Sequence, residues 1–177
     1  LPLLNEQVRI STWAYGMKAF YGYRNFKMED ADGNLLAYAN SVWVLVNTQT
    51  ARPVKVPQEF ADTYGLEPQL EMDCAKRKIQ IPDDMKQNGE IVVPQFFIDS
   101  NQHMNNEKYI MLAQQQLPAG FEISELRVEY RKEAKLGDTI ISFVKAADEQ
   151  VTVVLADEDK RPYAVVKFLR KPVPDKK

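Results

Sequence analysis

The sequence lacks several features that would place it in familiar protein classes. Cys74 is the single cysteine among 177 residues, which excludes an internal disulfide and a cysteine-rich zinc site and favours a reducing compartment. No apolar run approaches the roughly 20 residues that span a bilayer, and no basic, apolar leader opens the sequence. We therefore expect a globular protein of the cytoplasm, without a membrane span.

The chain also has no excess of positive charge. It carries 23 lysine and arginine residues against 25 aspartate and glutamate residues, a net charge of -2, so it has no general attraction to nucleic acid. Basic residues cluster at 76–78 and 131–135, but short clusters of this kind are usually solvated surface. No nucleic-acid partner is expected.

The residues that are present favour β-structure. An apolar content of 45%, with 10% aromatics, is sufficient for a hydrophobic core. Segments rich in Val, Ile, Tyr, Phe and Trp alternate with turn residues, which is typical of antiparallel strands. The predicted strands are 6–14, 20–29, 35–47, 91–98, 122–133, 138–147, 150–156 and 162–171.

One helix is predicted, from about 106 to 117. Apolar residues recur there at helical spacing, and a proline and a glycine follow. Asn105 or Asn106 is the natural N-cap, because an asparagine side chain can accept a bond from an otherwise unpaired backbone N–H. A single helix among strands must pack on the sheet or be wrapped by it, which is the hotdog arrangement and an α+β fold. The apolar positions of the helix are Tyr109, Leu112, Ala113 and Leu117.

The stretch IDSNQHMNNEKYI, residues 98–110, collects polar side chains where an apolar run ends. In an extended strand Asp99, Asn101 and His103 would share one face, in a row about 13 Å long. That row can act on one atom only if the chain bends, and the helix beginning at 105 or 106 would supply the bend. Free backbone N–H groups at that helix start would favour a developing oxyanion.

Other interpretations of this stretch are weaker. A calcium loop beginning at Asp99 would need glycine and glutamate where the chain has Met104 and Ile110, so it is rejected. One histidine with one acid and amides makes a poor transition-metal site. Turn and cap hydrogen bonds before a helix explain the spacing as well as catalysis does, and spacing alone leaves that alternative open.

The polar row is part of a longer pattern that resembles the bacterial type of acyl-acyl carrier protein thioesterases. Their Asp-x-Asn-x-His-x-Asn-Asn-x-x-Tyr signature matches in register, and the resemblance continues at 20–26, 41–57, 65–73 and 128–134. It implies a tandem double hotdog, with a partial first hotdog at 1–52, a connector at 53–89 and a catalytic hotdog at 90–177. The matching signature residues are Asp99, Asn101, His103, Asn105, Asn106 and Tyr109.

The resemblance also assigns a second acid to the site. Glu133 matches the glutamate that joins the catalytic network in the family, although strand parity alone places it in a charged row with Arg127, Glu129 and Arg131. Two departures from the family are visible. Ala134 stands where plant members tend to have a cysteine, which excludes a cysteine nucleophile there, and Leu112 replaces a frequent tryptophan, which would reshape the acyl tunnel.

The activity implied by the resemblance is hydrolysis of acyl-acyl carrier protein to free fatty acid, which ends fatty acid synthesis. No Gly-x-Ser-x-Gly elbow is present, so we expect direct attack by water. Glu133 or Asp99 would be the base, His103 would position the water or protonate the thiolate, and Asn101 would orient the water or the carbonyl. The helix start at Asn105 and Asn106 would hold the oxyanion, without metal or cofactor.

Other functions and assemblies remain open at the level of sequence. The same site would suit an acyl-CoA thioesterase, and a hotdog could bind acyl groups without catalysis. The protein could be a monomer of two hotdogs or a homodimer. Because the sequence opens inside the first hotdog, we also expect roughly 60 to 80 residues upstream, including a second apolar helix that covers the sheet of 6–47.

Overall fold

A computed structural model describes residues 2–50 and 52–172 of the chain. Its elements divide into two units at the bond between Ala75 and Lys76. The stretch expected to be a connector, 53–89, contributes to both units, since it contains α1 (Gln58–Tyr64) and the start of β6 (Lys86–Val92). Among the described residues, no helix is both long and apolar enough to cross a membrane.

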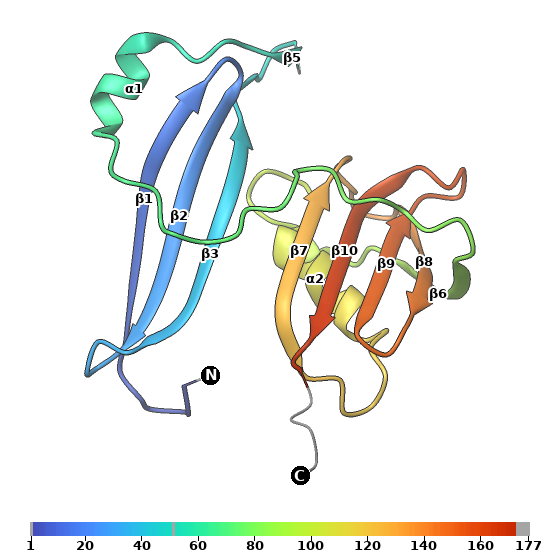
Figure 1. Cartoon of the computed structure of the whole chain (residues 1–177). Coiled ribbons are helices and arrows are strands. Elements are labelled where there is room, and N and C mark those ends of the chain that lie inside the picture. Colours follow the sequence, from blue (N-terminus) through green and yellow to red (C-terminus); the bar gives the residue numbers. More distant parts are fainter. Residues whose placement is uncertain (1, 51, 173–177) are drawn as a thin grey trace. The chain divides into compact units, whose positions relative to one another are not determined.

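The first unit is built on a three-stranded antiparallel sheet in sequence order (Figure 1). The turn between the second and third strands forms because the Asp30 carboxylate accepts the backbone N–H groups of Asp32 and Asn34, at 3.0 and 2.8 Å. The predicted hairpin is therefore confirmed. The strands are β1 (Val8–Lys18), β2 (Tyr21–Asp30) and β3 (Leu35–Val44), with a short pair formed by β4 (Val46–Asn47) and β5 (Arg52–Pro53).

The two faces of this sheet differ. The segment following α1 crosses one face, where the fully buried Asn25 accepts the backbone N–H of Leu70 at 2.9 Å and Trp13 donates its indole N–H to the Pro68 carbonyl at 2.9 Å (Figure 1). By strand alternation the opposite face carries Ile10 and Trp43, which are 67% and 59% exposed. Within this unit's described residues there is one helix, α1, and none of its own side chains is buried.

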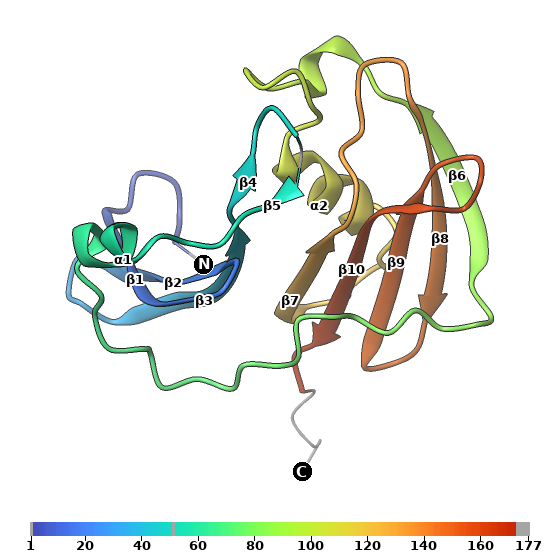
Figure 2. The same cartoon turned by 90° about the horizontal axis from the view of Figure 1, so that it is seen from above.

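The second unit is a five-stranded antiparallel sheet around one helix, α2 (Asn106–Gln114). Figure 2 shows α2 lying in the concave side of the curved sheet, the predicted hotdog arrangement. The buried side chains of Tyr109, Leu112 and Ala113 confirm three of the four predicted apolar positions. The helix ends at Gln114, earlier than the expected 117, and Leu117 packs against the same core from beyond the helix end. The sheet order is β6 (Lys86–Val92), β8 (Thr139–Ala146), β9 (Gln150–Ala156), β10 (Pro162–Arg170) and β7 (Ile123–Tyr130).

Alternation along the central strands gives this sheet two buried faces. Val153 and Leu155 of β9 belong to the cluster that packs against α2. Val154, between them, belongs to a second cluster with Val165 and the nearly fully buried Ile79. The chain before β6 therefore covers the face of the sheet opposite α2.

The two predicted strands that lead toward Asp99 and Glu133 end several residues earlier than expected. The strand expected at 91–98 is β6, which stops at Val92, and a 3-10 turn (Gln95–Phe97) follows Pro94. Proline has no N–H to donate to a strand ladder, which accounts for the break. The strand expected at 122–133 is β7, which stops at Tyr130, so Glu133 lies beyond its end.

Candidate active site

The Asp99 side chain closes a tight turn, and this corrects the expectation that the start of the helix supplies the bend. Its carboxylate accepts the backbone N–H of Asn101 at 2.8 Å and of His103 at 3.4 Å, while the Asp99 N–H donates to the His103 carbonyl at 2.9 Å. Gln102 adopts a positive φ of 64° within the turn. The bend that catalysis requires is thus inside the polar stretch, because an aspartate can satisfy the backbone of its own turn.

The start of α2 follows this turn. Asn105 is the N-cap, as predicted, and its side-chain oxygen accepts the backbone N–H of Glu107 at 2.9 Å. The N–H groups of Asn105 and Lys108 are also bonded, to the carbonyls of Phe97 and Asn105. Among the described N–H groups at this helix start, that of Asn106 is the one left without a partner, so it is the candidate oxyanion donor.

His103 and Glu133 come together although 30 residues separate them. The His103 Nε2 lies 3.2 Å from the Glu133 Oε2. The imidazole is 31% exposed and the carboxylate 70% exposed, so water reaches both groups. Glu133 does not belong to the charged row of β7, because the chain leaves the strand at Tyr130. A histidine paired with a carboxylate, open to water, has the composition of a general acid–base site.

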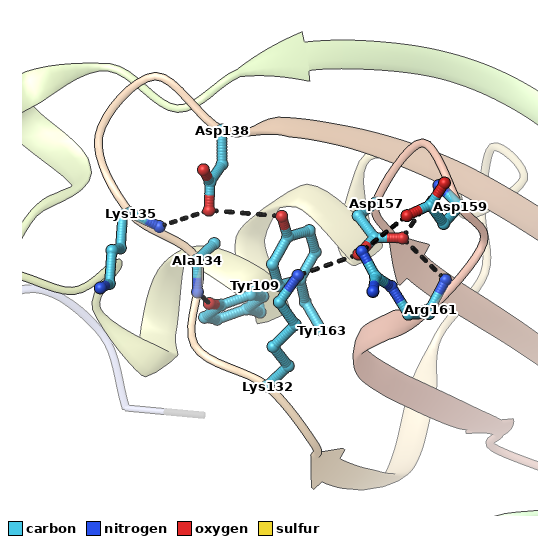
Figure 3. Close-up of polar contacts among 9 residues, drawn as sticks. All are labelled: Tyr109, Lys132, Ala134, Lys135, Asp138, Asp157, Asp159, Arg161 and Tyr163. Carbon is cyan, nitrogen blue, oxygen red and sulfur yellow. Dashed lines mark hydrogen bonds and ion pairs between the residues drawn. The ribbon is translucent and has the colours of Figure 1, made fainter.

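Backbone hydrogen bonds join the two segments that carry this pair. The Met104 N–H donates to the Ala134 carbonyl at 2.8 Å. The Ala134 N–H donates to the Tyr109 hydroxyl, also at 2.8 Å, as Figure 3 shows. Met104, Tyr109 and Ala134 are all buried. The neighbours of His103 and Glu133 are therefore fixed to each other and to α2.

A polar network supports the rest of the loop around Glu133 (Figure 3). Lys132 Nζ lies 2.9 Å from Asp157 Oδ2 and 4.7 Å from the centroid of the Tyr163 ring. The Tyr163 hydroxyl donates to Asp138 Oδ2 at 3.3 Å. The Lys132 side chain lowers the pKa of Asp157 to about 2, so this carboxylate remains charged at neutral pH. Sequence spacing gave no signal for this network, because its members come from three separate segments.

The charged residues Arg127 and Glu129 of β7, with Arg131 just beyond its end, have a structural role. The Glu129 carboxylate accepts the Ile79 N–H at 2.8 Å and an Arg131 N–H at 3.0 Å. The Arg127 guanidinium donates to the Lys76 carbonyl, and that of Arg131 donates to the Ile79 carbonyl. The row therefore holds residues 76–79 on the sheet, and the charge of Arg131 is already paired.

The structure also places the other residues that the sequence analysis considered. Cys74 is exposed and belongs to the other unit, where it contacts Gln69. Asn101 is exposed in the turn. Leu112 of α2, at the position where many family members have tryptophan, is buried in the core. Within residues 2–50 and 52–172, no cluster of His, Cys, Asp and Glu side chains could hold a metal ion.

Comparison with known families gives two matches that together cover most of the chain. A model of the acyl-ACP thioesterase N-terminal domain matches residues 1–64, and a model of the acyl-ACP thioesterase C-terminal domain matches residues 81–162. The second match contains the turn, the start of α2 and Glu133. The first match ends at the last residue of α1.

Individual proteins show the same similarity. The chain is 30% identical to the chloroplastic acyl-[acyl-carrier-protein] hydrolase FATB3 of Cuphea viscosissima, over 83% of this chain and 38% of that protein. It is 27% identical to oleoyl-acyl carrier protein thioesterase 1 of Arabidopsis thaliana, also chloroplastic, over 84% of this chain and 45% of that protein. The chain thus spans less than half the length of these curated relatives.

Solved structures agree on the fold. An acyl-ACP thioesterase from Bacteroides thetaiotaomicron, 20% identical, superposes with a TM-score of 0.84 over 94% of this chain and 69% of that one. A putative oleoyl thioesterase from Lactobacillus plantarum, 26% identical, superposes with a TM-score of 0.79 over 98% of this chain and 71% of that one. This likeness confirms the predicted tandem double-hotdog fold.

Proposed function

The chain belongs to the acyl-acyl carrier protein thioesterase family, and on that premise we propose that it is a thioester hydrolase of fatty acid synthesis that releases free fatty acid from acyl carrier protein. The observation that carries the proposal is the contact between His103 Nε2 and Glu133 Oε2, which are 3.2 Å apart. His103 lies three residues before the start of α2. Binding an acyl group requires no base, so the pair favours hydrolysis over an acyl-binding role without catalysis.

In this scheme Glu133 takes a proton from a water molecule as the water oxygen bonds to the thioester carbonyl carbon. Its exposed carboxylate can hold such a water, and general base catalysis contributes roughly 10²- to 10⁴-fold. His103, the partner of Glu133 in the contact, protonates the departing thiolate when the C–S bond breaks. The products are a carboxylic acid and the carrier thiol.

The oxyanion forms at the start of α2. The backbone N–H of Asn106 donates to it, which is worth roughly 10²- to 10³-fold for one donor. Asn105 acts indirectly, since its side chain caps the helix, and Asn101 orients the water or the carbonyl from the turn. Asp99 holds His103 in place through the turn, so in this scheme it is a positioning residue and Glu133 is the base.

Basic residues near the site could meet an acidic carrier protein. Arg131 and Lys132 are paired with Glu129 and Asp157, so much of their charge is compensated. Lys135 is exposed and bonds to Asp138 through its backbone N–H, which leaves its ammonium as the best candidate of the three.

The test is turnover of one acyl group on two carriers. We expect kcat/KM for acyl-acyl carrier protein to exceed that for the same acyl group on CoA by at least about tenfold, and Lys135→Ala to lower only the former. Faster turnover on CoA would reassign the protein as an acyl-CoA thioesterase. Saturable acyl binding without hydrolysis of either substrate would make it an acyl-binding protein.

A further inference from the structure

The position of Glu133 depends on the loop that carries it. This loop, residues 131–138, leaves the sheet at the end of β7 and returns at β8. The Glu133 side chain is 70% exposed, so packing does not fix it. Its contact with His103 therefore requires that the loop backbone be held by other groups.

Tyr109 holds the middle of the loop. Its hydroxyl, buried on α2, accepts the N–H of Ala134, the residue next to Glu133. The carbonyl of Ala134 accepts the N–H of Met104, the residue next to His103. One peptide segment thus connects the helix, the base and the histidine, as Figure 3 shows for Tyr109 and Ala134.

Tyr163 holds both ends of the loop. Its backbone carbonyl accepts the N–H groups of Arg131 and Lys132, at 2.8 and 3.2 Å. Its hydroxyl donates to Asp138 Oδ2, which also accepts the Lys135 N–H at 2.9 Å. Tyr163 is 2% exposed at the start of β10, so it ties the loop to a buried position on the sheet; Figure 3 shows its contact with Asp138.

Neither tyrosine is suited to carry protons in the reaction. Burial raises the pKa of the Tyr109 hydroxyl and of the Tyr163 hydroxyl to about 12, so both hydroxyls stay protonated at neutral pH. Their hydroxyls act by hydrogen bonding alone.

We propose that Tyr109 and Tyr163 are positioning residues, whose hydroxyls hold loop 131–138 so that Glu133 stays in contact with His103. The kinetic part of this inference rests on the proposed hydrolase function, whereas the structural part does not.

Phenylalanine at either position keeps the ring and removes the hydroxyl. Tyr64→Phe is the matched control, because Tyr64 is exposed on α1 and keeps its ring contact with Arg24.

The first measurement needs no substrate. His103 is the only histidine of the chain, so its imidazole resonances in NMR spectra are unambiguous. We expect Tyr109→Phe and Tyr163→Phe to move these resonances toward their positions in Glu133→Gln, and Tyr64→Phe to leave them in place. Unchanged resonances in both folded tyrosine variants would overturn the inference. If one variant fails to fold, the other still decides.

The second measurement is kinetic. Misplacing a catalytic group by about 1 Å can cost roughly 10²-fold, so each hydroxyl deletion should lower kcat about 10- to 100-fold with KM changed less than about twofold. In a Glu133→Gln background the same deletions should change the residual rate less than about twofold. An equal loss in both backgrounds would show a general structural role and refute the inference. Absence of hydrolysis by the wild type would refute the proposed function, while the NMR result stands separately.

Discussion

Replacing Glu133 by glutamine removes the proposed base and keeps the size and polarity of the side chain. General base catalysis is worth roughly 10²- to 10⁴-fold, so kcat should fall by at least about 100-fold, or about 2.7 kcal/mol of barrier. The pair with His103 is 70% exposed on the Glu133 side, and exposed pairs stabilise folding by about 0 to 1 kcal/mol. The unfolding midpoint should therefore hardly change.

The assay is release of carrier thiol at saturating acyl-acyl carrier protein, with circular dichroism on the same samples. Glu129→Gln is the matched control, because Glu129 lies one position from the end of β7 and holds Ile79 and Arg131 instead of His103. It should keep kcat within about threefold and lower the unfolding midpoint. The reasoning is refuted if Glu133→Gln keeps kcat within about threefold of the wild type, or if Glu129→Gln loses as much.

Three further perturbations have defined outcomes. Asp99→Ala should lower hydrolysis about 100-fold while acyl substrate still binds, because the turn that positions His103 is lost; near-normal hydrolysis would argue against this role of the turn. Cys74→Ser and thiol alkylation should both be nearly silent, since this exposed thiol contacts the Gln69 amide, which is not a base, whereas inactivation prevented by substrate would make it the nucleophile. Asp157 is stabilised as the anion by Lys132, so its contribution to stability is complete above pH about 4 and is lost as pH falls toward 2. The urea midpoints of wild type and Asp157→Asn should differ at pH 7 and converge between pH 4 and 2; a constant difference would contradict this.

The sequence was informative where one physical requirement dominated a segment. The spacing of Tyr109, Leu112 and Ala113 follows from the need to bury one helix face, and the N-cap at Asn105 follows from the unpaired N–H groups of that helix. The antiparallel strands are predictable because they are rich in residues that favour a sheet. The end of β6 is not predictable from hydrophobicity, since Pro94 breaks the strand through its missing N–H.

The site was less predictable because its contacts join distant segments. Strand parity placed Glu133 beside Glu129, whereas the chain turns off the sheet after Tyr130. The turn at Asp99 depends on a local side-chain bond that competes with strand pairing. Nothing in the spacing indicates that the Tyr163 hydroxyl reaches Asp138, 25 residues earlier. Such hydrogen bonds form only once the strands are paired, because pairing is what brings these distant residues together.

The most direct test of the central claim is hydrolysis of a single defined acyl-acyl carrier protein by the wild type and by His103→Ala, at equal concentrations and with equal circular dichroism spectra. We predict that the wild type releases carrier thiol and fatty acid in equal amounts and that His103→Ala does so at least about 100-fold more slowly. Rates equal within about twofold would show that the thioester is cleaved elsewhere, and a wild-type rate no faster than the uncatalysed reaction would contradict the function itself.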